Sequence, residues 1–328
     1  MKKPQYRTKP HSVETVTQER IAPRKDLGQN FLRDANIARN IVRALDVQAD
    51  DTIIEIGPGE GALTKLLLEQ SAEQGGDGVV AVEYDARAVE LLRTKFADAI
   101  AEGRLHLVQS DVLKTTIRDL SENVPSQPAS APKRLKIIGN IPYYITSDIL
   151  FWVFGEWAKS KSFHSSEVPT PATASNQPVL DRAVIMMQKE VGERIVAKQR
   201  TKDYGILSIA SMLVSEPKVL FHVSPSCFFP PPKVTSSVVE FRLRPSAEAA
   251  SAFLQTQPLV RVAFNQRRKM LSNALHGTLS QISAAQADTT PATIIALAEE
   301  RGLSYFRKRA EELTPQDFIT LAAFLHEI

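Results

Sequence analysis

Residues 52–61 read Thr-Ile-Ile-Glu-Ile-Gly-Pro-Gly-Glu-Gly, an apolar run that leads directly into a glycine-rich turn. A helical pattern of apolar residues begins after the turn, at Leu63. Glycines let the backbone approach a ligand without an intervening Cβ, and the start of the following helix presents free N–H groups. Read as Gly57-x-Gly59-x-x-Ala62, the turn also satisfies a relaxed dinucleotide fingerprint. The stretch therefore predicts a strand, a turn and a helix that hold a nucleotide-like cofactor.

Three further apolar runs end in polar residues, and they span 78–83, 105–111 and 135–140. An acid at the end of the second strand, here Glu83, is placed to accept hydrogen bonds from a ribose diol. Asp111 is expected to accept from an adenine amine, and Asn140 to lie between cofactor and substrate. This order of strand ends favours S-adenosylmethionine over a nicotinamide cofactor, because no His or Lys stands at a strand end as an acid or base.

The segment Asn140-Ile141-Pro142-Tyr143 follows the last of these runs. The Asn140 side-chain oxygen and the Ile141 carbonyl can both accept hydrogen bonds, while Pro142 lacks an N–H and stiffens the turn. Tyr143 supplies a ring on which a planar group can stack. The segment is also compatible with an ordinary strand that ends in a proline turn. With the cofactor pattern upstream, it predicts a site for the exocyclic amine of a purine.

Strands that alternate with helical patterns predict a parallel sheet built from βαβ units, an α/β fold. A helix is expected from about Asn36, with Asp34 as its cap, and a fifth strand over 182–188. Residues 218–223 and 237–243 are expected to form a closing pair of strands. After Pro245 the pattern is helical to the end of the chain.

These patterns divide the chain into a tail, 1–25, a catalytic domain, 26–245, and a helical domain, 246–328. Residues 120–132 and 160–178 are rich in Ser, Pro and Ala and are expected to be loop inserts. The tail carries seven basic residues against two acidic ones and lacks hydrophobic periodicity, which indicates disorder. It fits either a transit peptide or a flexible arm that touches RNA, and its acids and prolines favour the arm.

Composition excludes several classes of protein. The 328 residues are 43% hydrophobic, which is enough to bury a full core. No apolar run reaches the ~18 residues that cross a bilayer, and the N-terminus lacks the apolar stretch expected of a secretory signal. The single cysteine, Cys227, excludes an internal disulfide and fits a reducing compartment. Six scattered histidines indicate no metal site, and a net charge of +3 is too small to argue for RNA binding.

The chain resembles the KsgA/RsmA family of bacterial ribosomal RNA adenine N6-dimethyltransferases from about residue 24 onward. The segments that carry the resemblance are 27–32 (Leu-Gly-Gln-Asn-Phe-Leu), 55–59, Glu83, Asp111, 139–143, 228–234 (Phe-Phe-Pro-Pro-Pro-Lys-Val) and 264–269 (Phe-Asn-Gln-Arg-Arg-Lys). The resemblance implies a Rossmann-like class I S-adenosylmethionine-dependent methyltransferase sheet with a small all-helical C-terminal domain that binds RNA. It also implies dimethylation of N6 on two adjacent adenosines near the 3′ end of 16S ribosomal RNA and a role in small-subunit biogenesis. The implied protein is a cytoplasmic monomer whose partner is the 30S subunit or its precursor.

The resemblance also assigns residues. It places Asn30 and Leu32 in the cofactor site together with Gly57 and Gly59. It makes Phe228, which precedes three prolines, the second aromatic wall around a flipped-out base. The alternative is that Phe228 and Phe229 are both simply buried core at a domain junction. Phe229 is assigned to packing.

The run 261–269 contains four basic residues and has a helical period. A charge run is usually a solvated face. Beside a catalytic domain that acts on a nucleic-acid base, phosphate contact is the favoured interpretation. The RNA-contacting residues are therefore predicted to be Arg261, Arg267, Arg268 and Lys269.

Other functions remain compatible with the sequence. The same chemistry could act on large-subunit RNA or on DNA, but segment 228–234 and the length of the C-terminal domain favour the small subunit. A methyltransferase-like binding protein without catalysis is a second alternative, and the intact Asn140, Tyr143, Gly57 and Glu83 argue against it.

Overall fold

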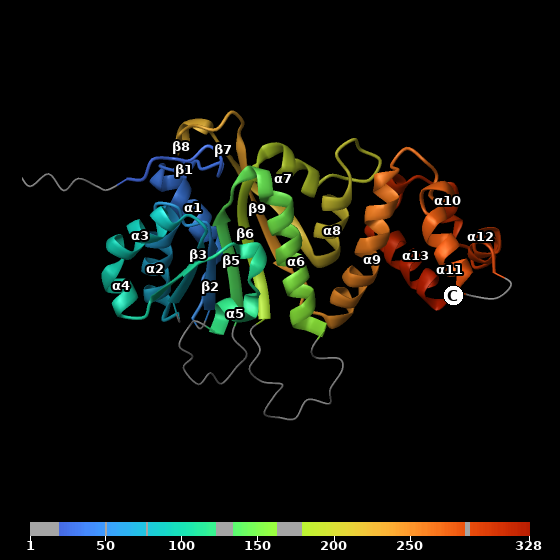
Figure 1. Cartoon of the computed structure of the whole chain (residues 1–328), viewed down its shortest axis with the longest axis horizontal. Helices are drawn as coiled ribbons and strands as arrows, with labels where there is room; N and C mark the ends of the chain where they lie inside the picture. The colour runs from blue at the N-terminus through green and yellow to red at the C-terminus, as the bar shows by residue number, and fades with distance from the viewer. Residues whose placement is uncertain (1–19, 50, 77, 123–133, 163–178, 286–288) are drawn as a thin grey trace, which may run out of the picture.

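The computed structural model describes residues 20–49, 51–76, 78–122, 134–162, 179–285 and 289–328 (Figure 1). Within them, seven strands form one sheet in the order β4-β3-β2-β5-β6-β9-β7. The strands β2 to β6 pair in parallel, and β9 runs antiparallel to both β6 and β7. The sheet strands are β2 Asp51–Ile56, β3 Gly78–Glu83, β4 Leu105–Gln109, β5 Arg134–Asn140, β6 Val179–Gln188, β7 Ser215–Val223 and β9 Ser236–Leu243.

The predicted parallel sheet and its antiparallel closing pair are therefore confirmed. Every residue of β2 and β3 is buried, as expected for central strands with helices on both faces. The strand β7 begins at Ser215 and includes Pro217, which is tolerated because β7 lies at the edge of the sheet.

Helices lie along both faces of the sheet (Figure 1). The first of them, α1, begins after Asp34, whose carboxylate accepts from the N–H groups of Asn36 and Ile37 and so confirms the predicted cap. The helices are α1 Ala35–Leu45, α2 Ala62–Gln74, α3 Ala86–Lys95, α4 Ala97–Ala101, α5 Ile117–Glu122, α6 Thr146–Ser162, α7 Lys189–Ile195, α8 Ile206–Val214, α9 Ala247–Asn265, α10 Leu271–Ala274, α11 His276–Ala284, α12 Pro291–Glu300 and α13 Pro315–Glu327.

The two faces of the sheet bury separate cores because successive side chains of a strand point to opposite sides. On β2, Ile53 packs with α1 and α2, whereas Ile54 belongs to the cluster formed with α6, α8 and α9. The second of these clusters extends beyond the sheet into the C-terminal helices as far as Phe324.

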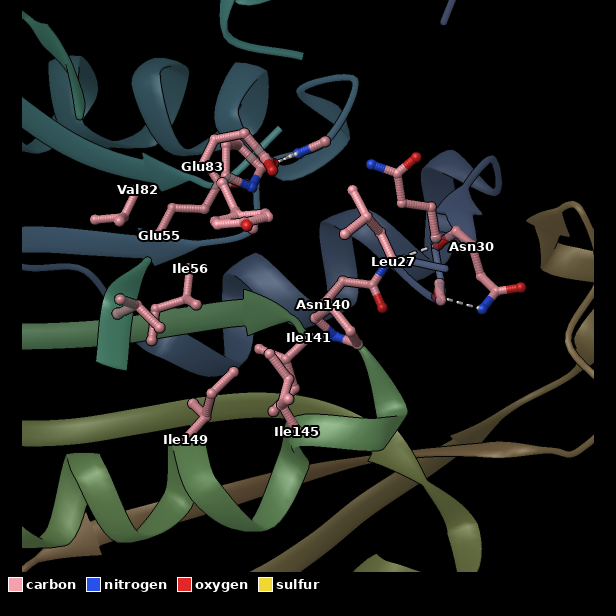
Figure 2. A pocket seen from close by; sticks show the side chains of 18 of the residues that line it. Leu27, Asn30, Glu55, Ile56, Val82, Glu83, Asn140, Ile141, Ile145 and Ile149 are labelled. Atoms are coloured by element: carbon pink, nitrogen blue, oxygen red, sulfur yellow. Dashed lines mark hydrogen bonds between the residues drawn. The ribbon is translucent and has the colours of Figure 1, made fainter. Parts of the chain in front are cut away.

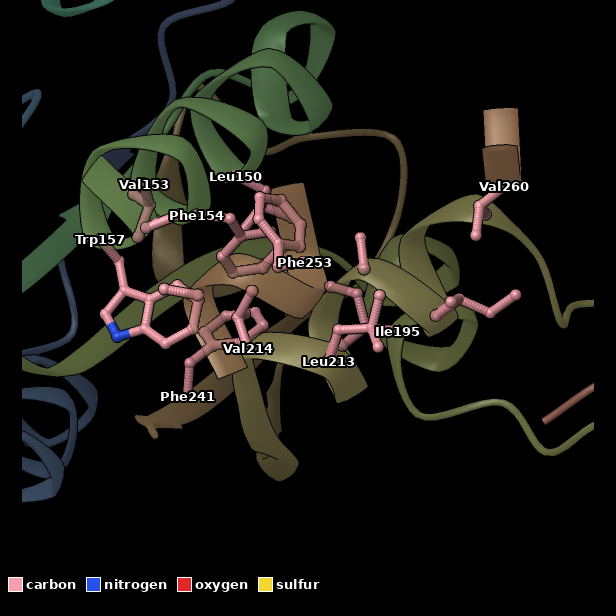
Figure 3. Close-up of a cluster of buried hydrophobic side chains, with 14 of the residues drawn as sticks. Leu150, Val153, Phe154, Trp157, Ile195, Leu213, Val214, Phe241, Phe253 and Val260 are labelled. Carbon is pink, nitrogen blue, oxygen red and sulfur yellow. The ribbon is translucent and has the colours of Figure 1, made fainter. Parts of the chain in front are cut away.

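Aromatic side chains join the sheet to those helices (Figure 3). The ring of Phe154 on α6 lies 5.6 Å from that of Phe241 on β9 and 6.4 Å from that of Phe253 on α9, centroid to centroid. Trp157 also contacts Phe253, and its indole N–H donates to the Arg244 carbonyl at 3.0 Å. The helices after Pro245 therefore share the core of the sheet.

A separate two-stranded ribbon lies above the carboxyl ends of the sheet strands (Figure 1). It pairs β1, Phe31–Leu32, with β8, Phe228–Phe229, in antiparallel register. The ribbon brings the Gly-Gln-Asn-Phe-Leu segment against the segment that precedes the three prolines, although almost two hundred residues separate them in the chain.

Most of the predicted tail and of both inserts lies outside the described residues. Leu120 to Glu122 end α5, and residues 160–162 end α6. In the part of the chain that the structure describes, no helix combines the length and the apolar character needed to cross a membrane.

Candidate active site

A pocket of about 380 Å³ opens at the carboxyl ends of β2, β3 and β5, where open α/β sheets bind their ligands (Figure 2). All the predicted cofactor residues line it, together with the whole Asn-x-Pro-Tyr segment. These residues are Asn30, Leu32, Gly57, Gly59, Glu83, Asp111, Asn140, Ile141, Pro142 and Tyr143. The structure thus brings together residues from five separate parts of the sequence, and their roles toward ligands stay predictions.

The glycine-rich turn forms one wall of the pocket. Gly57 and Gly59 both have positive φ, 68° and 56°, which only glycine adopts readily. A Cβ on Gly59 would lie 3.1 Å from the ring of Phe31, so the turn packs closely under the ribbon. The turn therefore presents bare backbone to the pocket, which leaves room for a ligand to lie close.

Glu83 connects the end of β3 to this turn. One carboxylate oxygen accepts from the N–H of Gly59 at 3.0 Å, and the other accepts from the N–H of Asp85 at 2.9 Å. Burial raises the pKa of Glu83, while these two backbone hydrogen bonds lower it. Each oxygen keeps a further lone pair, so a fixed carboxylate can accept from the two hydroxyls of a ribose.

Asn140 is held in one orientation at the end of β5. Its amide nitrogen donates to the carbonyl of Asn30 at 3.1 Å, and the Asn30 side chain donates in turn to the carbonyl of Gly28 at 3.0 Å (Figure 2). Because the nitrogen is engaged with Asn30, the side-chain oxygen of Asn140 is the end that can accept from a ligand in the pocket. This is the polarity that an amine substrate requires.

Tyr143 is anchored at its far end. Its hydroxyl lies 2.6 Å from the Oγ of Ser236, the buried first residue of β9. Burial raises the pKa of Tyr143, which keeps the phenol neutral. The hydrogen bond fixes the ring, so Tyr143 can present one orientation to a stacking base.

Asp111 lies just beyond β4, where it caps a short 3₁₀ turn and accepts from the N–H of Leu113 at 3.1 Å. Its side chain is 32% exposed and lines the pocket. The second oxygen lies 4.0 Å from the Nζ of the exposed Lys114 and keeps lone pairs with which it can accept from a ligand amine.

The two phenylalanines of β8 lie opposite to their predicted roles. Phe228 is 5% exposed and packs in the core with α1, whereas Phe229 is 53% exposed. The alternative of a buried Phe228 is thus the one observed, and the assignment of Phe229 to packing is wrong. Alternate residues of a strand face opposite sides, and the pairing of β8 with β1 turns Phe228 inward.

Two tyrosines at the pocket were not predicted from the sequence. Tyr84 and Tyr144 both line it, and they are 64% and 61% exposed. Each directly follows a residue that was predicted, Glu83 and Tyr143 respectively. The sequence pattern that could have predicted them is an aromatic residue one position past a strand-end motif. At that position a ring can reach the rim of the same pocket.

Glu55 lies near the end of β2, just before the glycine-rich turn, and the sequence predicts no role for it. It is completely buried, and burial raises its pKa to about 8, although the hydroxyl of Thr64 donates to it at 2.6 Å. Glu55 therefore carries a proton at neutral pH, and an uncharged carboxyl group lies beside the glycine-rich turn.

The variant Glu55→Gln should become more stable than the wild type as the pH rises. In the folded protein Glu55 binds its proton up to a pKa of about 8, whereas the unfolded chain releases it near 4.5. Wild-type stability should therefore fall between these two pH values by about 1.4 kcal/mol per pH unit from this group. Gln keeps the shape and can accept from Thr64, but it does not titrate. Melting temperatures of both proteins from pH 5 to 8 test this: parallel curves would mean that Glu55 is not protonated.

The predicted RNA-contacting residues lie in two different settings. The helical period was expected to continue to Lys269, but α9 ends at Asn265 and a turn follows. Arg261, still on α9, lies over the ring of Phe151 at 4.4 Å from its centroid. Arg267 folds back onto the protein: it pairs with Glu311 at 2.7 Å and donates to the carbonyls of Thr201 and Lys202.

Arg268 and Lys269, in that turn, are exposed. Since Arg267 is satisfied by the protein itself, it is poorly placed to bind phosphate as well. The geometry therefore supports a solvent-facing role for Arg268 and Lys269 and a structural one for Arg267.

Comparisons with known proteins agree with this geometry. The family model described as "Ribosomal RNA adenine dimethylase" matches residues 21–303. A protein of Salinibacter ruber named "Ribosomal RNA small subunit methyltransferase A" is 38% identical over 304 residues, which cover 92% of this chain and 85% of the relative. A protein of the same name from Methylococcus capsulatus is 35% identical over 298 residues. The matched region covers 90% of this chain and the full length of that relative.

Solved structures share the fold. A dimethyladenosine transferase from Plasmodium falciparum superposes with a TM-score of 0.66 at 23% identity, over 90% of this chain and 98% of that one. The 23S rRNA methyltransferase ErmE superposes with a TM-score of 0.55 at 22% identity, over 90% of this chain and 100% of ErmE. These likenesses confirm the predicted fold, a Rossmann-like α/β sheet followed by helices.

Proposed function

Because the chain belongs to the ribosomal RNA adenine dimethylase family, we propose that it dimethylates N6 of adenosines in small-subunit ribosomal RNA, with S-adenosylmethionine as methyl donor. The observation that carries the proposal is the orientation of Asn140, whose amide nitrogen is tied to Asn30 so that its oxygen can accept from an amine. The predicted targets are two adjacent adenosines near the 3′ end of 16S ribosomal RNA, and the predicted role is in small-subunit biogenesis.

The residues at the pocket fit the methyl donor. The positive φ of Gly57 and Gly59 keeps the turn open for a close-lying ligand, and the fixed Glu83 carboxylate beside it can accept from a ribose diol. Asp111 can accept from the adenine amine, and Asn30 and Leu32 line the same pocket. When bound, S-adenosylmethionine supplies an activated methyl group whose leaving sulfur needs no acid catalyst.

The task left to the protein is to position and polarise the amine. The N6 lone pair of adenine is delocalised into the ring and is a poor nucleophile. Hydrogen bonds from N6 to the Asn140 oxygen and to the Ile141 carbonyl favour a pyramidal nitrogen whose lone pair points out of the ring plane. The Tyr143 ring, fixed through Ser236, holds the base and faces the positive charge that grows on N6.

We further propose that the protein acts as a cytoplasmic monomer on the 30S subunit or its precursor. The base must leave its stack to reach Asn140, which lines the pocket at the strand ends. The C-terminal helices share the core of the sheet, so any RNA surface on them is fixed relative to the pocket.

A mass-spectrometric count of N6,N6-dimethyladenosine tests this function. Ribosomal RNA from cells with and without the protein is compared, with small-subunit and large-subunit RNA measured separately. Loss of the nucleoside from small-subunit RNA alone is the expected result. Loss from large-subunit RNA would assign a different substrate, and no change in either would leave the protein without the proposed activity.

Arg268→Ala and Lys269→Ala should each weaken RNA binding and flatten its salt dependence by roughly 0.7–0.9 in log–log slope, the effect of one lost phosphate contact. Arg267→Ala is the matched comparison. It should instead destabilise the fold by about 1–2 kcal/mol, because Glu311 and two carbonyls lose their donor. Filter binding at several salt concentrations and melting temperatures separate the two effects. Unchanged binding by both exposed variants would remove this turn from the RNA surface.

A further inference from the structure

The ribbon of β1 and β8 presents one face toward the glycine-rich turn. Phe31 lies directly opposite Phe229 in the antiparallel pair, and the pairing continues as the N–H of Arg33 donates to the Cys227 carbonyl at 2.8 Å. Opposed residues, and residues two apart on one strand, share a face. Phe31, Arg33 and Phe229 therefore lie on the same side of the ribbon.

This face is fastened to the cofactor side of the pocket at two points. The ring of Phe31 packs against Gly59, and Arg33 pairs with Glu60 of the same turn at 2.7 Å. Arg33 also lies over the ring of Phe229, with its guanidinium carbon 5.6 Å from the ring centroid. Successive contacts thus connect the glycine-rich turn to Arg33 and Arg33 to Phe229.

Phe229 is the exposed member of this series of contacts. A single exposed apolar side chain is ordinary, but this ring is held in place by a planar guanidinium whose charge is already balanced by Glu60. A fixed aromatic ring beside a guanidinium is the composition of surfaces on which bases of single-stranded nucleic acid stack. Because Glu60 already balances the charge of Arg33, the guanidinium is better suited to stack on a base than to bind a phosphate.

The position of Phe229 indicates which base it would meet. The carbonyl of Asn30 holds Asn140, and the next residue, Phe31, lies opposite Phe229. Phe229 is therefore only one peptide step and one cross-strand step, at most about 10 Å between Cα atoms, from the residue that holds Asn140. When a target base leaves its stack, its neighbours in the strand lose a stacking partner.

We propose that Phe229 and Arg33 form a second stacking subsite, which takes the nucleobase adjacent to the target base in the same RNA strand. This inference rests on the proposed function and adds to it a contact outside the methyl-transfer pocket. It predicts little preference among the four bases at that position, because every base has a π face.

The test compares Phe229→Ala with Phe229→Tyr, which keeps the ring, and with Leu254→Ala, an exposed apolar residue on α9 as control. KM and kcat are measured with small subunits that lack the modification. Phe229→Ala should raise KM about 5- to 100-fold, the usual effect of losing one stacked base. Phe229→Tyr and Leu254→Ala should match the wild type, and S-adenosylmethionine affinity should be unchanged in all three variants.

A second measurement identifies the partner of the ring. Short RNAs that contain the target adenosine, with and without an abasic nucleotide on either side of it, are titrated against wild type and Phe229→Ala. The loss caused by Phe229→Ala should disappear when the flanking base is absent. An equal loss on abasic RNA, or wild-type KM for Phe229→Ala, would overturn the subsite. Methylation of the small subunits by the wild type checks the proposed function separately, so the two failures are distinguishable.

Discussion

Asn140→Ala should lower kcat by ~10²–10³ while the affinity for S-adenosylmethionine changes little. The variant removes the side-chain oxygen that the amine would use, and the Ile141 carbonyl alone cannot orient the nitrogen lone pair. Asn140 is the first residue of the Asn-x-Pro-Tyr segment and does not belong to the glycine-rich turn, so the substitution leaves the backbone at Gly57 and Gly59 intact. Single-turnover methyl transfer and calorimetric titration with the cofactor measure the two quantities. Wild-type turnover would remove Asn140 from the reaction.

Asn140→Asp distinguishes the acceptor from its orientation. The carboxylate keeps an acceptor oxygen but cannot donate to the Asn30 carbonyl, which holds the native amide at 3.1 Å. Two oxygens would then face each other, so the side chain should turn away. Activity as low as that of Asn140→Ala is expected. Recovery of activity in Asn140→Asp would mean that the hydrogen bond to Asn30 does not matter.

Glu83→Ala should weaken S-adenosylmethionine binding by ~10–100-fold, with a smaller effect on the chemical step. Hydrogen bonds to a charged acceptor contribute about 1.5–3 kcal/mol, and they act on the bound ground state and the transition state alike. The same carboxylate holds the N–H groups of Gly59 and Asp85, so its loss also loosens the turn.

Glu90→Ala is the matched control for Glu83→Ala. Glu90 is a solvent-exposed acid on α3, paired with Arg93 at 2.8 Å, and lies outside the residues that line the pocket. It should bind the cofactor like the wild type and melt at the same temperature. Unchanged cofactor affinity in Glu83→Ala would make Glu83 a structural residue of the turn only.

The sheet and its ligand edge were predictable because they depend on local patterns. Apolar runs of strand length end at Glu83 and Asn140, and parallel strands bring their carboxyl ends to one edge whatever the loops between them do. The orientation of Asn140 was not predictable, since it depends on the Asn30 carbonyl, 110 residues away in the chain.

The errors came from features that only pairing or chain reversal decides. Which of Phe228 and Phe229 faces the core follows from the register of β8 against β1, and a two-residue strand carries no periodic signal. Likewise, a run of basic residues does not reveal that one member, Arg267, turns back to bind carbonyls of a distant loop.

The core that passes from the sheet into the C-terminal helices has a consequence for how the protein can be altered. Phe154 and Trp157 on α6 rest against Phe253 of α9, so a chain cut after Pro245 would expose aromatic rings that are buried here. The two parts should therefore melt together in a single cooperative transition. The helices are accordingly not a detachable module: a foreign C-terminal part could replace them only if it also filled the space occupied by Phe253.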